Sequence, residues 1–315
     1  MTSDTLGTAS ASSPVPAPVH ASVSGTWTLG DRTVHRIGFG TMRLPQTGRA
    51  LVPQAVPRDR GQAVRVLRRA VELGVNHIDT AAFYFSPLRS ANELINHALA
   101  PYGDDLVIAT KVGPARGLNG EWLEHARTPE QLRGQVEENL RQLGRDHLDL
   151  VNLRILGTDS VAERFGALAE LQQAGLIRHL GLSNVQPHQI TEAQTVAPVV
   201  CVQNPYGIGA SAEQEAVLRL CADQGIAFVP FYAIAGAGRE TGADEAAEPA
   251  QVLAVAKTHG VSTAQVRLAW TLHRGPHVLA IPGTGDPAHL EDNLAAGALR
   301  LSAEDLALLE EAHTA

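Results

Sequence analysis

The chain has 315 residues, of which 44% are apolar and 18% are charged, and its formal net charge is −8. This composition supplies a large hydrophobic core, which excludes a disordered chain. The acidic balance does not favour nucleic-acid binding, and no apolar run approaches the ~18 residues of a membrane span. The two cysteines, Cys201 and Cys221, exclude a disulfide scaffold, so a reducing compartment and a cytoplasmic location are expected.

The first 25 residues differ in composition from the rest of the chain. They are rich in Ser, Thr, Ala, Pro and Val, and the run Pro14–Val19 cannot hold a helix. The segment lacks the basic start and the apolar run of a secretory signal. We therefore predict a disordered arm over residues 1–25 and one domain over residues 26–315. The Gly/Ala/Glu-rich stretch 236–249 is interpreted as a loop inside that domain.

Two patterns alternate from residue 26 onward. The run Thr28–Arg36 predicts a small hairpin, and helical periodicity is clear over residues 60–74 and 128–144. The second helix is expected to begin after the cap Thr128, with a proline at its first position, and to end at Gly144. Between such stretches lie short β-rich runs, which begin at Ile37, Val75, Leu106, Leu148, His179, Val199, Ile226 and Val278.

The β-rich runs are nearly continuous in apolar residues, which is typical of parallel strands buried on both faces. Eight such strands alternating with helices predict an α/β fold, a single (β/α)8 TIM barrel that follows a short N-terminal β-hairpin and the disordered arm. A doubly wound open sheet is the alternative. That fold usually carries a G-x-G-x-x-G turn after its first strand, and the run IGFGTMRL lacks it.

Polar residues follow the predicted strands where barrel enzymes place their chemistry. Asp79 and Tyr84 follow the second strand, Lys111 the third and Arg154 the fourth, and Lys111 is one of only two lysines. Asp79 would keep a buried Lys111 charged, and the ammonium would lower the pKa of Tyr84 from its ordinary value of about 10. Tyr84 would then be a proton donor to an oxygen that gains negative charge, as when hydride adds to a carbonyl carbon.

The motifs that carry these residues resemble the aldo-keto reductase superfamily. GVNHIDTAAFYF, ATK, LIRHLGLSNV, VCVQNPY, GIAFVPFYAIAG and IPGTGDPAHLEDN stand in the family's order, and the resemblance covers roughly residues 26–313. It implies a (β/α)8 barrel that reduces an aldehyde or ketone to an alcohol with NAD(P)H. It also implies that Tyr84 is the acid, assisted by Asp79 and Lys111.

The same resemblance implies a set of cofactor-binding residues. Ser183, Asn184 and Gln203 would hold the nicotinamide amide, and Phe231 would stack on the ring. The loop from Tyr232 would hold the pyrophosphate, and the segment from Ile281 the adenosine 2′-phosphate end. The full set is Gly40, Thr41, Met42, Asp79, Ser183, Asn184, Gln203, Phe231, Tyr232, Ile234, Gly236, Ile281, Gly283, Thr284, His289 and Asn293.

Two departures from the family pattern bear on cofactor and substrate. Arg154 stands where the family commonly has His, and an arginine stays charged and cannot relay a proton. We expect Arg154 to orient the carbonyl oxygen or to hold an anionic group beside it, unless it forms a structural ion pair. Gly283 and His289 stand where Lys and Arg are common, so the usual cations for the 2′-phosphate are missing. NADPH is the expected cofactor, with NADH as its competitor.

The segments VNLRI and IPGT…HLEDN resemble a bacterial branch of the family, the pyridoxal reductases. This resemblance implies pyridoxal as a possible substrate, whose phenolate would suit Arg154. Phe85, which replaces a common Gly, and Trp122 are the candidates for pocket walls. Another aldehyde or ketone of a specialised pathway is the alternative substrate.

Two other functions stay open from the sequence. Lys111 alone would allow a Schiff-base aldolase. The family also includes channel-associated subunits that bind the cofactor and serve mainly as partners. The scattered histidines show no metal-ligand spacing, so no metal is expected. The expected partner is a small carbonyl compound, with no nucleic acid and no membrane, and the sequence points to no particular oligomeric state.

Overall fold

The computed structural model describes residues 18–117, 119–234 and 247–314, and a parallel sheet lies at its centre. Seven strands of the described chain pair in the order β13-β12-β11-β10-β9-β6-β3, all parallel. Their bounds, in chain order, are β3 (Phe39–Gly40), β6 (His77–Asp79), β9 (Val107–Val112), β10 (Leu148–Arg154), β11 (Ile177–Ser183), β12 (Cys201–Gln203) and β13 (Ala227–Phe228).

The segment 278–280 closes this sheet into a barrel. Val278 forms a parallel bridge to Phe228 on one side, and Ala280 forms one to Ile37 on the other. The backbone N–H of Leu279 donates to the Phe228 carbonyl at 2.9 Å, and the N–H of Ala280 donates to the Arg36 carbonyl at 2.8 Å. The predicted (β/α)8 barrel is thereby confirmed. Each strand overlaps one of the predicted β-rich runs, although β11 begins at Ile177, two residues before the predicted start at His179.

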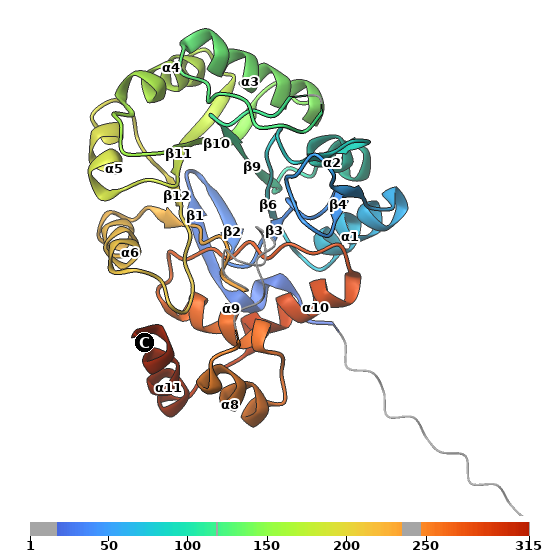
Figure 1. The fold of residues 1–315 in the computed structure, drawn as a ribbon, viewed down its shortest axis with the longest axis vertical. Coiled ribbons are helices and arrows are strands. Elements are labelled where there is room, and N and C mark those ends of the chain that lie inside the picture. Colours follow the sequence, from blue (N-terminus) through green and yellow to red (C-terminus); the bar gives the residue numbers. More distant parts are fainter. Residues whose placement is uncertain (1–17, 118, 235–246, 315) are drawn as a thin grey trace, which may run out of the picture.

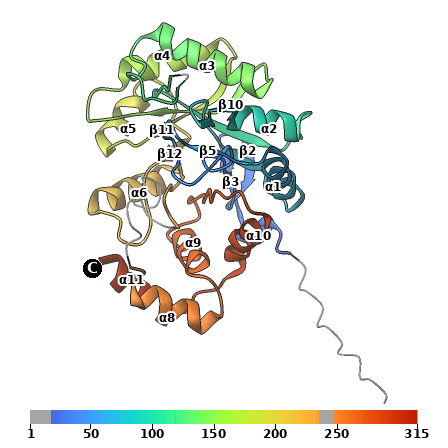
Figure 2. The ribbon, with the colours of Figure 1, turned by 45° about the vertical axis from the view of Figure 1, so that its right-hand side comes forward.

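Helices surround the strands (Figure 1). The ring consists of α1 (Arg60–Glu72), α2 (Ala91–Leu99), α3 (Pro129–Leu143), α4 (Ala162–Gln173), α5 (Pro187–Gln194), α6 (Ala212–Gln224), α9 (Thr263–His273) and α10 (Pro287–Ala295). Outside it, α8 (Ala250–His259) packs on α9, and α11 (Ala303–Thr314) packs on α8 (Figure 2). Short elements complete the described chain: η1 (Ala21–Ser24), η2 (Ala296–Ala298) and the hairpins β4 (Gln46–Thr47) with β5 (Val56–Pro57) and β7 (Phe85–Ser86) with β8 (Arg89–Ser90).

The boundaries of α3 follow from local chemistry. The Thr128 hydroxyl accepts from the Gln131 N–H, and the Thr128 N–H donates in return to Gln131 Oε1, which completes a capping box. Pro129 occupies the first turn, where no backbone N–H is needed. Gly144 ends the helix in the left-handed conformation with φ of 64°. The predicted start and end of this helix are confirmed. Among the described residues, no helix is long and apolar enough to cross a membrane.

The last part of the predicted arm is ordered. Residues 1–17 lie outside the described part of the chain, but residues 21–24 form η1. The Ala21 N–H donates to the Leu73 carbonyl at 2.8 Å, and the Ser24 hydroxyl accepts from the Ile37 N–H at 3.1 Å. These long-range contacts hold residues 18–25 against the barrel, so the prediction of disorder is wrong for this last part of the arm.

The predicted hairpin closes one end of the barrel. Strands β1 (Thr26–Leu29) and β2 (Arg32–His35) pair antiparallel across the middle of the ring (Figure 1). Leu29 and Val34 are buried and form one apolar cluster with interior residues of the strands, namely Val107, Ala109, Leu150, Cys201, Ala227, Val229 and Leu279. Burying Leu29 and Val34 stabilises the closed end by roughly 2 kcal/mol for each side chain. The opposite end, at the carboxyl ends of the strands, remains available for a binding site.

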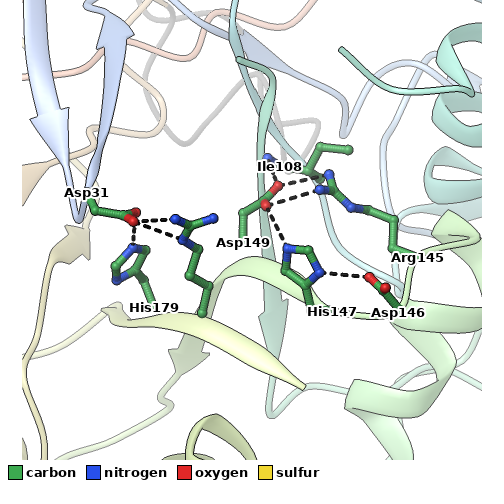
Figure 3. Close-up of polar contacts among 8 residues, drawn as sticks. Asp31, Ile108, Arg145, Asp146, His147, Asp149 and His179 are labelled. Carbon is green, nitrogen blue, oxygen red and sulfur yellow. Dashed lines mark hydrogen bonds and ion pairs between the residues drawn. The ribbon is translucent and has the colours of Figure 1, made fainter. Parts of the chain in front are cut away.

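Ion pairs fix the tip of this hairpin to the barrel (Figure 3). Asp31 accepts hydrogen bonds from Arg178 Nε at 3.1 Å and from His179 Nε2 at 2.7 Å. The hydrogen bond from Arg178, followed by that from His179, lowers the pKa of Asp31 below its ordinary value. Gly30 approaches the same histidine so closely that a Cβ there would lie 2.4 Å from His179 Nε2. The tip therefore requires both a small residue and a carboxylate.

The substitution Asp31→Asn tests this attachment. We expect it to lower the free energy of unfolding by less than about 1 kcal/mol at neutral pH, because the pair is half exposed. A carboxylate with a depressed pKa stabilises the fold above its unfolded value of about 3.9, and this contribution is lost as the pH falls through the folded value. Urea unfolding at about pH 7 and about pH 3 should show the difference from wild type shrinking at the lower pH.

The matched control is Asp104→Asn, which removes an exposed carboxylate without a hydrogen bond or ion pair in the described chain. It should change stability little at either pH. A deficit of Asp31→Asn that stays equal at both pH values would contradict the electrostatic origin of this attachment.

Candidate active site

A cavity of about 980 Å³ lies at the carboxyl ends of the barrel strands. Asp79 ends β6, Arg154 ends β10 and Gln203 ends β12, and all three line it. The barrel therefore gathers distant parts of the sequence at one opening. The predicted site residues that line this cavity are Gly40, Met42, Asp79, Tyr84, Lys111, Trp122, Arg154, Gln203, Phe231, Tyr232, Ile234, Ile281, Gly283, Thr284, His289 and Asn293.

A buried ion pair forms the floor of the site. Lys111 Nζ lies 2.6 Å from Asp79 Oδ1 and 2.7 Å from Oδ2, and it also donates to the Thr80 carbonyl at 3.0 Å. Gln203 Nε2 donates to Asp79 Oδ2 at 2.8 Å. Burial is the largest single influence and acts to lower the pKa of Lys111, but the combined effects of Asp79 and Tyr84 outweigh it, so the pKa is raised. Lys111 is therefore an ammonium ion at neutral pH.

Tyr84 lies buried beside this pair. Its N–H donates to the Ala81 carbonyl at 3.0 Å, and its carbonyl accepts from the Ala91 N–H at 2.8 Å. The Lys111 Nζ stands 4.9 Å from the centroid of the tyrosine ring. Burial raises the pKa of Tyr84, and the opposing effects of Lys111 and Arg154 do not cancel it.

The direction of this pKa corrects the sequence prediction. Lys111 does favour the phenolate of Tyr84, as expected, but burial dominates and the pKa is raised rather than lowered. Tyr84 therefore stays a phenol at neutral pH. This is the form that a proton donor requires.

Arg154 extends from the end of β10 into the cavity. Its Nη1 donates to the Ser183 hydroxyl at 3.2 Å, and its Cζ lies 5.0 Å from the centroid of the Phe231 ring. The register of β10 and β11 places Arg154 directly opposite Ser183. No carboxylate of the described residues forms an ion pair with this guanidinium, so the alternative of a structural ion pair receives no support. Its charge is open to the cavity.

Some predicted residues lie behind the cavity wall rather than on it. Thr41 is buried, and its hydroxyl donates to the Asp79 carbonyl at 3.0 Å. Ser183 is buried beneath Arg154. Asn184 has φ of 59°, and its Nδ2 donates to the Ile155 carbonyl at 2.9 Å. Gly236 lies outside the described residues.

The two residues predicted to form pocket walls, Trp122 and Phe85, line different cavities. Trp122 lines the cavity, with its ring 5.9 Å from that of Phe83. Phe85 instead lines a neighbouring hollow of about 750 Å³, next to α3. Arg116 holds the loop that carries Phe83 and Phe85, because its Nη1 donates to the carbonyl of Phe83 at 3.2 Å and to that of Phe85 at 2.9 Å. This arginine fixes the loop that carries the aromatic wall.

The sequence interpretation missed one whole side of the cavity. Segment 42–58, which includes the β4–β5 hairpin, contributes Arg43, Arg49, Leu51 and Val52 to the lining, together with Arg58. Phe83 was also missed, although it directly precedes Tyr84. No regular spacing marks segment 42–58 in the sequence, and only its arginines give a signal.

Glycines allow the first and last strands of the barrel to meet at the cavity. A Cβ on Gly40 would lie 2.5 Å from the Ile281 carbonyl oxygen, and one on Gly283 would lie 2.6 Å from the Gly40 carbonyl oxygen. Both distances are too short for any side chain. Among the described residues, no group of three or more metal-ligating side chains gathers at this site or elsewhere.

Comparison with protein families matches residues 36–314 to the aldo/keto reductase family. A protein named pyridoxine 4-dehydrogenase, from Escherichia coli, is 44% identical over 294 residues, which cover 91% of this chain and 98% of that one. A protein named as an uncharacterized oxidoreductase, from Schizosaccharomyces pombe, is 41% identical over 295 residues, which cover 93% of this chain and 91% of that one.

Solved structures agree. An aldo-keto reductase from Klebsiella pneumoniae in complex with NADPH superimposes with a TM-score of 0.75 at 27% identity, over 91% of this chain and 94% of that one. The thermostable aldo-keto reductase Tm1743 in complex with epalrestat has a TM-score of 0.74 at 28% identity, over 91% and 98% of the two chains. The resemblance found in the sequence motifs is confirmed, and the chain belongs to the aldo/keto reductase family of oxidoreductases.

Proposed function

We propose that the protein reduces the carbonyl group of a small aldehyde to an alcohol with NADPH, and that Tyr84 donates the proton. The observation that carries this proposal is the buried phenol of Tyr84 beside the Asp79–Lys111 ion pair, on the wall of the cavity. A phenol held next to an ammonium ion can release its proton to an oxygen that gains negative charge. The family membership gives this arrangement its reaction class.

The residues of the cavity fit the cofactor. Gln203 Oε1 is buried and has no hydrogen-bond partner among the described residues, whereas its Nε2 is bonded to Asp79. An acceptor left free in this way is suited to the carboxamide N–H of a nicotinamide. Phe231 offers an aromatic ring next to it, and the segment from Ile281 would hold the adenosine end. The K. pneumoniae relative was crystallised with NADPH, which supports the same cofactor here.

In this proposal, Tyr84, Lys111 and Asp79 carry out the proton transfer that accompanies hydride addition. When bound, NADPH supplies a hydride to the carbonyl carbon. As negative charge develops on the carbonyl oxygen, the Tyr84 hydroxyl donates its proton to that oxygen. Lys111 stabilises the phenolate that remains, and Asp79 keeps the ammonium charged at a buried position.

This geometry disfavours the aldolase alternative. A Schiff base forms from a neutral amine. Lys111 is held as an ammonium ion by both oxygens of Asp79 and by the Thr80 carbonyl. Its raised pKa makes the neutral form rarer still.

The walls of the cavity favour an aromatic substrate with a negative charge beside its carbonyl. Phe83, Trp122 and Phe231 supply aromatic surface, and Arg154 supplies a positive charge that no carboxylate of the described residues pairs. Pyridoxal carries a phenolate next to its aldehyde and so matches both features. The identity of 44% to a relative named pyridoxine 4-dehydrogenase supports the same substrate here.

Replacing Tyr84 by Phe tests the proton donor. We expect Tyr84→Phe to lower kcat at least about 100-fold, because it removes the general acid and keeps the ring. NADPH binding, measured by fluorescence titration, should stay within about twofold, since the lost hydroxyl belongs to the proton-transfer step. Turnover near the wild-type rate would refute the assignment of Tyr84.

Arg154 is tested with a matched pair of aldehydes. Salicylaldehyde carries a hydroxyl beside its aldehyde, as pyridoxal does, and benzaldehyde does not. We expect Arg154→Gln to lower kcat/KM at least about tenfold for pyridoxal and salicylaldehyde, and at most about threefold for benzaldehyde, because a charge-assisted contact is lost only with the first two.

Three outcomes would count against parts of this proposal. An equal loss for all three aldehydes would make Arg154 structural. Turnover of benzaldehyde but not of pyridoxal would support the reductase activity and exclude pyridoxal as the substrate. Tight NADPH binding without turnover of any carbonyl would favour a protein that binds the cofactor and serves as a partner.

A further inference from the structure

At one end of the cavity, the segment from Ile281 lacks the lysine and the arginine that the family commonly supplies for a phosphate group. Thr284, Gly285 and Asp286 line this end together with His289. Gly283 stands where the family commonly has lysine, and here a Cβ would lie only 2.6 Å from the Gly40 carbonyl oxygen. The close approach of the backbone at Gly283 to the backbone at Gly40 therefore excludes a side chain at position 283. The other cation position, where the family commonly has arginine, holds His289.

Arg58 reaches the same end from a different part of the chain. It follows β5, and its guanidinium lies against Gly285, where a Cβ would be 2.0 Å from Arg58 Cζ. Its Nη1 donates to the Gly285 carbonyl at 3.4 Å and its Nη2 to the Gln46 carbonyl at 3.3 Å. Gln62 Nε2 donates to the same Gly285 carbonyl at 2.7 Å. These contacts hold the guanidinium in place before any ligand binds.

The charge of Arg58 is not neutralised by the described chain. Its hydrogen-bond acceptors are the backbone carbonyls of Arg43, Gln46 and Gly285, and no described carboxylate forms an ion pair with it. Burial, followed by repulsion from Arg43, lowers the pKa of Arg58, while Asp286 opposes this. Asp286 in turn caps α10, since its Oδ1 accepts from the Ala288 N–H at 2.8 Å. The guanidinium of Arg58, which bonds only backbone carbonyls within the described chain, therefore favours an anion at this end.

We propose that Arg58 binds the 2′-phosphate of NADPH and replaces the cations that the family commonly supplies from positions 283 and 289. A guanidinium matches two phosphate oxygens at once and stays charged at any physiological pH. NADH carries a hydroxyl at the same position of the ribose, so Arg58 discriminates between the two nucleotides. This role of Arg58 rests on the proposed use of NADPH, and it names the residue that determines the preference for NADPH over NADH.

Equilibrium binding tests this without turnover. We expect Arg58→Gln to weaken NADPH binding at least about tenfold in a fluorescence titration, and to change NADH binding by less than about twofold. Adenosine 2′,5′-bisphosphate should lose affinity as NADPH does, and adenosine 5′-monophosphate should not. Arg58→Lys keeps the positive charge but removes the paired N–H donors of the guanidinium. Its affinity for NADPH should fall only about threefold to fivefold.

The matched control is Arg60→Gln. Arg60 is exposed, lies two residues further along and does not line the cavity, so its substitution removes the same charge without touching the site. NADPH binding should stay within about twofold of wild type. A loss of similar size in Arg60→Gln would overturn the specific role of Arg58 and leave only a general effect of net charge.

Two further results separate the possible failures. If Arg58→Gln weakens NADPH and NADH equally, Arg58 only holds segment 42–58 against Gly285, and the inference is overturned. If wild type binds NADPH at least about tenfold more tightly than NADH and Arg58→Gln keeps that ratio, another residue determines it and only this inference falls. If wild type binds neither nucleotide, the proposed function fails and the inference with it.

Discussion

The ion pair between Asp79 and Lys111 is the constraint on which the site depends. Removing two charges from water costs several kcal/mol for each ion, and a pair buried in this way adds little or nothing to stability. Here the cost is offset by two contacts shorter than 2.8 Å and by hydrogen bonds to Thr80 and from Gln203. Such a pair ties the ends of β6, β9 and β12 together. It also leaves an ammonium ion beside Tyr84, and in the proposed reaction this charge stabilises the phenolate that remains once the phenol has lost its proton.

The barrel separates the parts that stabilise it from the parts that react. At one end the β1–β2 hairpin buries Leu29 and Val34 in the interior, and half-exposed ion pairs such as Asp31–Arg178 hold its tip (Figure 3). At the other end the strands stop at polar residues whose hydrogen-bonding capacity is not exhausted, such as Gln203. Because the apolar closure of the first end does not depend on the residues of the second, those residues are free to vary with the substrate.

The sequence predicted the repetitive parts of this molecule well. The strands, the boundaries of α3 and the order Asp79, Tyr84, Lys111 and Arg154 all follow from local patterns or from motifs. Three features could not be predicted, because each depends on residues far apart in the chain. The pKa of Tyr84 is raised because the side chain is buried. Position 283 cannot carry a side chain because it contacts the backbone of Gly40. Arg58 reaches the cavity only because segment 42–58 folds onto Gly285.

The distribution of charge in the cavity follows from which cations have a carboxylate partner. The charge of Lys111 is cancelled by Asp79, so a carbonyl oxygen near Tyr84 meets a neutral phenol and a compensated ion pair. Arg154 and Arg58 have no such partner among the described residues, and they lie at different parts of the same cavity. A chain with a net charge of −8 thus presents local positive charge at two separate points. In the proposed function, this arrangement suits a cofactor and a substrate that each bring an anionic group.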